Sequence, residues 1–142
     1  MTTSSESVRI LLVEDNPIDV RATLRAAREL KISNSIDVVN DGDAAIQYFE
    51  SGDHPVPDLV LLDLNLPGRD GHDVLAYIKQ DDALKRIPVV ILTTSANDAD
   101  VLGAYDRGAN AYVNKPIDLA GWQALVNQIE GFWFSAVRLP PA

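Results

Sequence analysis

The chain has 142 residues, 46% of them hydrophobic, which is enough for one buried core and one domain. Its formal net charge of -9 excludes the basic surface with which proteins bind nucleic acid. It contains no cysteine, and no apolar run approaches the roughly 18–20 residues of a membrane span, so we expect a cytoplasmic protein without disulfides.

Five short apolar runs alternate with helix-like segments along the chain. The runs cover Arg9 to Val13, Ile36 to Val39, Leu59 to Leu62, Pro88 to Leu92 and Ala111 to Val113. The first, third and fourth are continuously apolar, which is typical of strands covered on both faces of a parallel sheet. The pattern predicts an α/β fold, a flavodoxin-like doubly wound five-stranded parallel sheet of order 2-1-3-4-5 with helices on both faces.

Helix signals lie between these runs. Asn16-Pro17 predicts the start of the first helix, because Asn caps a helix and Pro suits its first position. After Asp118, apolar residues recur at helical spacing as far as Trp133, which predicts a long last helix with one apolar stripe. We therefore expect a flexible tail over residues 1–7, a domain over residues 8–134 and an extended C-terminal segment over residues 135–142.

Acidic residues follow two of the strands. Glu14 and Asp15 come directly after the first strand, and Asp63 comes directly after the third. In the predicted strand order these two strand ends flank the point where ligands bind. A single acid at a strand end often caps the next helix, but three acids at one edge repel each other and need a cation. Oxygen donors of this kind favour Mg2+, so the sequence predicts a magnesium site.

The residues at the strand ends also form motifs that resemble those of response-regulator receiver domains in two-component signalling. Thr93 ends the fourth strand and Lys115 ends the fifth, so that a hydroxyl and an ammonium reach the acidic edge and can hold phosphoryl oxygens. The resemblance covers roughly Val8 to Glu130 and is carried by Val13-Glu14-Asp15-Asn16, Leu62-Asp63-Leu64-Asn65-Leu66-Pro67, Leu92-Thr93-Thr94-Ser95 and Asn114-Lys115-Pro116.

The resemblance implies a role for each residue of these motifs. Asp63 accepts a phosphoryl group from a histidine of a sensor kinase, and Mg2+ is held by Glu14, Asp15, Asp63 and the backbone carbonyl of Asn65. Lys115 contacts the phosphoryl oxygens. The protein would then catalyse its own phosphorylation and dephosphorylation, without being an enzyme that acts on a separate substrate.

Further implications concern the switch. Thr93 moves toward the phosphoryl group, Tyr112 changes rotamer, and the Lys115-Pro116 peptide is cis. Glu14 stands where the family often has Asp, and Thr94 stands where a small Ala is usual, so the lifetime of the phosphorylated state is left open.

The second half of the chain is similar to regulators that partner phytochrome-type histidine kinases. In that group an extended last helix and tail form a homodimer. We expect a dimer or partner surface that includes Tyr105, Tyr112, Phe132, Trp133 and Phe134, with Val137 and Leu139 beyond them. The alternative is that Trp133 and its neighbours fold back on their own domain.

Two other functions fit the same motifs. One is a receiver-like adaptor that is never phosphorylated, although such a module needs none of the site residues. The other is a Mg2+-dependent phosphatase of the haloacid-dehalogenase kind, which needs a second Asp where this chain has Asn65, since an amide does not transfer the proton. His54 and His72 are assigned no role.

Overall fold

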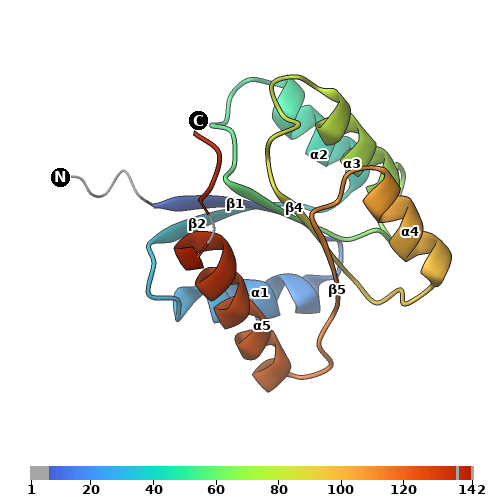
Figure 1. Cartoon of the computed structure of the whole chain (residues 1–142). Helices are drawn as coiled ribbons and strands as arrows, with labels where there is room; N and C mark the ends of the chain where they lie inside the picture. The colour runs from blue at the N-terminus through green and yellow to red at the C-terminus, as the bar shows by residue number, and fades with distance from the viewer. Residues whose placement is uncertain (1–6, 137, 142) are drawn as a thin grey trace.

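The structure is a computed structural model that describes residues 7–136 and 138–141. Five parallel strands form one sheet in the order β2-β1-β3-β4-β5, as predicted (Figure 1). They are β1 (Val8–Val13), β2 (Asn34–Val39), β3 (Leu59–Leu62), β4 (Val89–Thr93) and β5 (Ala111–Asn114). The three runs that are continuously apolar in sequence are the three central strands.

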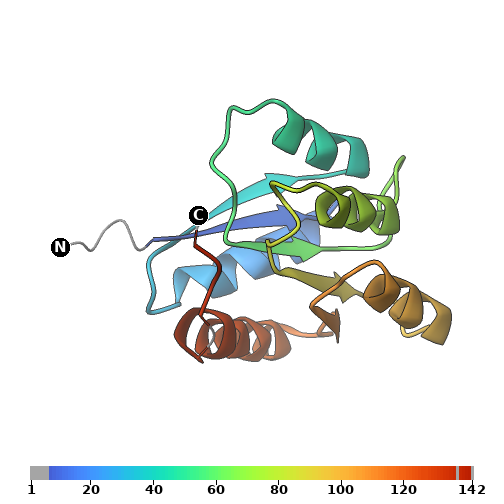
Figure 2. The same cartoon turned by 45° about the horizontal axis from the view of Figure 1, so that its top comes forward.

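Helices cover both faces of the sheet. They are α1 (Pro17–Arg28), α2 (Gly42–Glu50), α3 (Gly71–Gln80), α4 (Asp98–Asp106) and α5 (Leu119–Gly131). Figures 1 and 2 show α1 and α5 on one face and α2, α3 and α4 on the other. Each begins at a polar residue whose side chain accepts a backbone N–H, as Asn16 does for Ile18 and Asp19.

Alternate side chains of each central strand pack into two different cores, one on each face of the sheet. In β1, Leu11 and Val13 join the core under α2 and α3, whereas Ile10 and Leu12 join the core under α1 and α5. From Ile10 to Val13 both faces of β1 are therefore buried, which is why this part of the strand carries no polar residue.

The last helix differs from the prediction of one stripe that is apolar throughout. Trp122, Val126 and Ile129 are buried, but Leu119 is 60% exposed and Phe132 is 57% exposed. The chain continues after Gly131 into a π-helical segment, η2 (Phe132–Ala136), in which Phe132 is exposed whereas Trp133 and Phe134 still pack against the core under α1 and α5.

The ends of the chain are described only in part. Of the tail expected over residues 1–7, only Ser7 lies within the described residues, and Val137 lies outside them. Residues 138–141 contain no helix, and Leu139, Pro140 and Pro141 line a groove together with residues at the amino ends of the strands, among them Arg9 and Pro88. No helix in the described part of the chain is long and apolar enough to cross a membrane.

The expected cis peptide between Lys115 and Pro116 is wrong. All peptide bonds in residues 7–136 and 138–141 are trans. The trans form of a bond before proline is ordinarily favoured by about 0.5–1 kcal/mol, and Lys115 reaches the acidic edge from this trans backbone.

Gly71 holds the start of α3 against the loop that follows β3. Its N–H donates to the carbonyl of Leu64 at 3.0 Å. A Cβ at this position would overlap the backbone oxygen of Asp63 and lie 2.5 Å from the Cα of Leu64. The missing side chain thus allows α3 to pack on the backbone of Asp63.

We predict that Gly71→Ala lowers the free energy of unfolding by more than about 2 kcal/mol, because the added methyl has no space without a backbone shift. Gly131→Ala is the matched control, since its Cβ meets no atom within 4 Å, and it should change stability by less than about 1 kcal/mol. Urea unfolding of both variants measures the difference, and equal midpoints would contradict the prediction.

Candidate functional site

Three acids meet where β1 and β3 end. One carboxylate oxygen each from Glu14, Asp15 and Asp63 lies within 4.8 Å of the others. Sheet pairing continues into both loops, because Glu14 N–H donates to Val39 at 3.0 Å and Asp63 N–H donates to Val13 at 3.0 Å. Glu14 and Asp63 are buried, whereas Asp15 is exposed, so the cluster is rigid on one side and open to solvent on the other.

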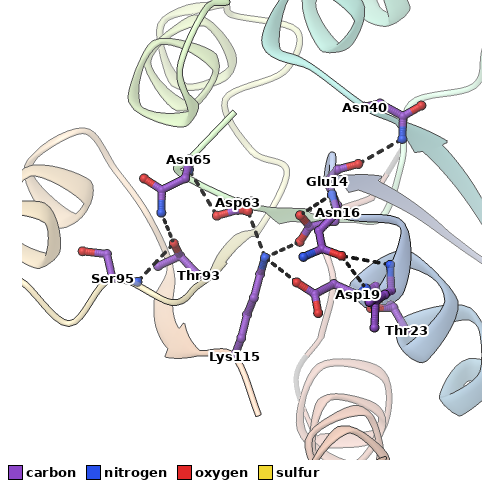
Figure 3. A network of polar contacts seen from close by, with 11 residues as sticks. Glu14, Asn16, Asp19, Thr23, Asn40, Asp63, Asn65, Thr93, Ser95 and Lys115 are labelled. Atoms are coloured by element: carbon purple, nitrogen blue, oxygen red, sulfur yellow. Dashed lines mark hydrogen bonds and ion pairs between the residues drawn. The ribbon is translucent and has the colours of Figure 1, made fainter. Parts of the chain in front are cut away.

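Lys115 neutralises this edge (Figure 3). Its ammonium lies 2.7 Å from Glu14 Oε1, 2.9 Å from Asp63 Oδ2 and 2.9 Å from Asp19 Oδ2, and its side chain is only 6% exposed. Burial lowers the pKa of Lys115, but the hydrogen bonds to Asp19, Glu14 and Asp63 outweigh it and raise that pKa above its ordinary value. The lysine is therefore a fixed positive charge.

Burial dominates the protonation of Glu14. It raises the pKa of Glu14 to about 7, although hydrogen bonds from Lys115 and from the Asn16 N–H lower it. The Asn16 N–H donates to Glu14 Oε2 at 3.1 Å, and the Asn40 side chain donates to the Glu14 carbonyl at 3.0 Å. Both the side chain and the backbone of Glu14 are thus held in place.

Thr93 is linked to Asp63 through Asn65. The Asn65 N–H donates to Asp63 Oδ1 at 3.1 Å, and the Asn65 amide donates to Thr93 Oγ1 at 3.4 Å. The Ser95 N–H also donates to Thr93 Oγ1, at 3.4 Å, and Thr93 is fully buried. The hydroxyl therefore lies between the loop that carries Asp63 and the loop that leads to α4.

The second loop connects to β5 and to α4. Tyr112 donates its phenolic proton to the Ser95 carbonyl at 2.9 Å, and the Ser95 hydroxyl donates to Asp100 at 2.6 Å. Asp100 also contacts His72 of α3 at 3.4 Å. Hydrogen bonds from Ser95 and then His72 lower the pKa of Asp100. An open groove of about 510 Å³, lined by residues that include Asp15, Asn65 and His72, runs beside the acids.

The structure thus brings together Glu14, Asp15, Asp63, Thr93 and Lys115 as predicted from sequence, and places Tyr112 one hydrogen bond further out. Sequence reasoning missed Asp19, Ser95, Asp100 and the contact of His72. Asp19 stands in the first turn of a predicted helix, a position where an acid is explained equally well by the helix dipole.

The residues expected at a dimer or partner surface divide into two groups. Tyr105 and Phe132 are 49% and 57% exposed. Trp133 and Phe134 are only partly buried but pack against the core under α1 and α5, as the fold-back alternative predicts. Trp133 also meets the ring of Phe132 edge-on at 5.4 Å.

Comparison of the chain with known proteins identifies a family with the same sequence features. Residues 10–127 match the family described as the response regulator receiver domain. The chain is 44% identical over 137 residues to response regulator Rcp1 of Synechocystis sp., covering 94% of this chain and 93% of that protein. It is 30% identical over 125 residues to the chemotaxis protein CheY-3 of Vibrio cholerae, covering 88% of this chain and 93% of that protein.

Solved structures agree. The phosphorylated cyanobacterial phytochrome response regulator RcpA is 42% identical and superposes with a TM-score of 0.91, covering 95% of this chain and 99% of that one. The Mn2+-bound form of Rcp1 is 42% identical and superposes with a TM-score of 0.88, covering 94% of this chain and 99% of that one.

We predict that Lys115→Met lowers the free energy of unfolding by about 3–5 kcal/mol in the presence of a chelator, because buried carboxylates lose their cation. Millimolar Mg2+ should restore much of this loss. Lys85→Met, which removes an exposed lysine 3.2 Å from Asp82, is the control and should cost less than about 1 kcal/mol. Urea unfolding with and without Mg2+ measures both, and a Lys115→Met chain as stable as the wild type would refute the prediction.

Proposed function

Because the chain belongs to the response regulator receiver family, we propose that Asp63 accepts a phosphoryl group from a histidine of a sensor kinase. The observation that carries this proposal is the environment of the Asp63 carboxylate. One of its oxygens accepts from the Asn65 N–H and the other accepts from Lys115, at the open edge of the sheet. The carboxylate is therefore oriented by two donors, next to the groove that Asp15 and Asn65 line.

The site is suited to a divalent cation, and we assign it to Mg2+. Glu14, Asp15 and Asp63 offer only oxygen ligands, and the exposed side of Asp15 leaves room for water, which Mg2+ retains when it binds. The Asn65 carbonyl would complete the protein ligands. When bound, the ion neutralises the carboxylates and the phosphoryl oxygens.

The chain's own residues account for the transfer. An oxygen of Asp63 forms a bond to phosphorus while the bond from phosphorus to the kinase histidine breaks, and the electron pair returns to the imidazole nitrogen. Lys115 moves a hydrogen bond from Asp63 to a phosphoryl oxygen, so that charge is stabilised where it arrives. Attack of water on the same phosphorus, which releases phosphate, would account for autodephosphorylation.

Thr93 and Tyr112 would carry the signal outward. Thr93 Oγ1 accepts from the Asn65 amide and from the Ser95 N–H at 3.4 Å each, which are long hydrogen bonds. The proton of the Thr93 hydroxyl would be donated to a charged phosphoryl oxygen, a stronger hydrogen bond. Movement of Thr93 would pull on the loop whose Ser95 carbonyl holds the Tyr112 hydroxyl. Release of that bond would free Tyr112 to turn.

The partners follow from the relatives. Rcp1 and RcpA are response regulators, and RcpA is described as a phytochrome response regulator. We therefore propose that the partner is a phytochrome-type sensor histidine kinase in the cytoplasm and that the receiver domain covers residues 8–134. Exposed Tyr105 and Phe132 favour a homodimer in which residues 135–142 also take part.

The competing functions fit the site less well. An adaptor that is never phosphorylated has no use for three converging acids that must be neutralised by a buried ammonium. A phosphatase of the haloacid-dehalogenase kind needs a proton donor at position 65, where the Asn65 amide instead donates to Thr93.

We expect the wild-type chain to gain the mass of one phosphoryl group when it is incubated with Mg2+ and acetyl phosphate. Asp63→Asn should gain none, and Asp53→Asn, in an exposed loop, should behave as the wild type. Intact-mass spectrometry before and after mild alkali measures the labile adduct. An adduct of equal size on Asp63→Asn would refute the assignment of the acceptor.

Phosphorylation is expected to strengthen self-association. Phe132→Ala and Tyr105→Ala should each weaken the phosphorylated dimer about 5- to 30-fold, the usual cost of truncating an aromatic residue at an interface. Val56→Ala, which removes an apolar side chain 52% exposed, is the control. Sedimentation of both phosphorylation states measures the effect, and identical profiles for the two states would contradict it.

A further inference from the structure

Asp19 is a partly buried acid to which the proposed chemistry gives no role. Its carboxylate lies 2.9 Å from the Lys115 ammonium, and its side chain is only 18% exposed. It is not one of the acids that converge as a possible cation site in the described part of the chain, which are Glu14, Asp15 and Asp63. Figure 3 shows the Lys115 ammonium joined by dashed lines to the carboxylates of Asp63, Glu14 and Asp19.

Helix capping does not explain where the Asp19 side chain points. An acid in the first turn can accept the N–H of the capping residue. Here the Asn16 N–H donates to Glu14 instead, and the Asn16 side chain caps the N–H groups of Ile18 and Asp19. The start of α1 is therefore satisfied without the Asp19 carboxylate, which is free to contact Lys115.

The three carboxylates that accept hydrogen bonds from Lys115 differ in whether a bound cation would also need them. The ammonium has three N–H donors, and each faces one carboxylate. Glu14 and Asp63 are acids that a cation would also need, so Lys115 and the cation compete for them. Asp19 is the partner that lies outside this competition.

We propose that Asp19 is a positioning residue that keeps Lys115 paired when Glu14 and Asp63 turn to a divalent cation. Without Asp19, a displaced ammonium would be buried and unpaired, so Lys115 would hold Glu14 and Asp63 more tightly and the cation would bind more weakly. With Asp19, Lys115 yields these acids and stays beside Asp63, where a phosphoryl group arrives. This inference rests on the proposed cation site and phosphorylation.

The test is a double-mutant cycle read out by Mn2+ binding, measured from the electron paramagnetic resonance of the free ion. Asp19→Asn should weaken Mn2+ binding about tenfold when Lys115 is present, and only about twofold in a Lys115→Met background, where the loss of charge acts alone. Asp19→Glu should restore binding to within about threefold, since it returns the carboxylate.

Asp98→Asn is the matched control, because Asp98 also stands in the first turn of a helix and is exposed on α4. It should change Mn2+ binding less than about twofold. If Lys115→Met does not fold at the assay temperature, Lys115→Gln takes its place in the cycle. The comparison of Asp19→Asn, Asp19→Glu and Asp98→Asn also stands without the cycle.

Two outcomes would overturn the inference. If Asp19→Asn weakens Mn2+ binding equally in both backgrounds, Asp19 acts on the cation through its charge alone and not through Lys115. If Asp19→Asn does not weaken Mn2+ binding at all, Asp19 has no effect on the cation. The mass gain of the wild type with acetyl phosphate is measured in parallel. A chain that shows the predicted cycle but gains no phosphate would refute the proposed function alone, and one that gains phosphate without the cycle would refute only the role of Asp19.

Discussion

The ammonium of Lys115 lies between three carboxylates at the carboxyl edge of the sheet, and the architecture around the site depends on that neutralisation. Parallel pairing of β1 with β3 brings Glu14 and Asp63 to the same edge. The apolar cores on both faces of these strands exclude water from the side of the acids that faces the sheet. A buried carboxylate without a cation is costly, so the edge requires the lysine that β5 delivers. Because the acids need positive charge, the same edge is suited to bind a divalent cation and then the phosphoryl group that this cation would neutralise.

The fold could be read from the sequence because its signals are local and mutually consistent. The central strands are continuously apolar, and Asn16-Pro17 indicates where α1 begins. The five residues predicted to form the site do converge, because the strand order alone brings their strand ends together. These predictions needed only the periodicity of burial and the geometry of a parallel sheet.

The features that could not be predicted from the sequence depend on the direction of side chains and on local backbone geometry. Asp19 has one position in the chain but several possible partners, and the choice of Lys115 follows from the Asn16 N–H being taken by Glu14. The α-helical geometry of α5 ends at Gly131, where the π-helical segment begins, and no residue pattern signals this change. The Lys115-Pro116 peptide was wrongly expected to be cis by resemblance, since either isomer is accessible to a bond before proline.

The groove lined by Leu139, Pro140 and Pro141 has a practical consequence. These residues lie beside Arg9 and Pro88, at the amino ends of the strands, whereas the acids lie at the carboxyl ends. The four residues of β3 separate the two edges by about 13 Å of extended backbone. A fluorophore or fusion partner attached near Leu139 would therefore sit at the pole opposite Asp63, where it reports on the molecule without obstructing the approach of a kinase.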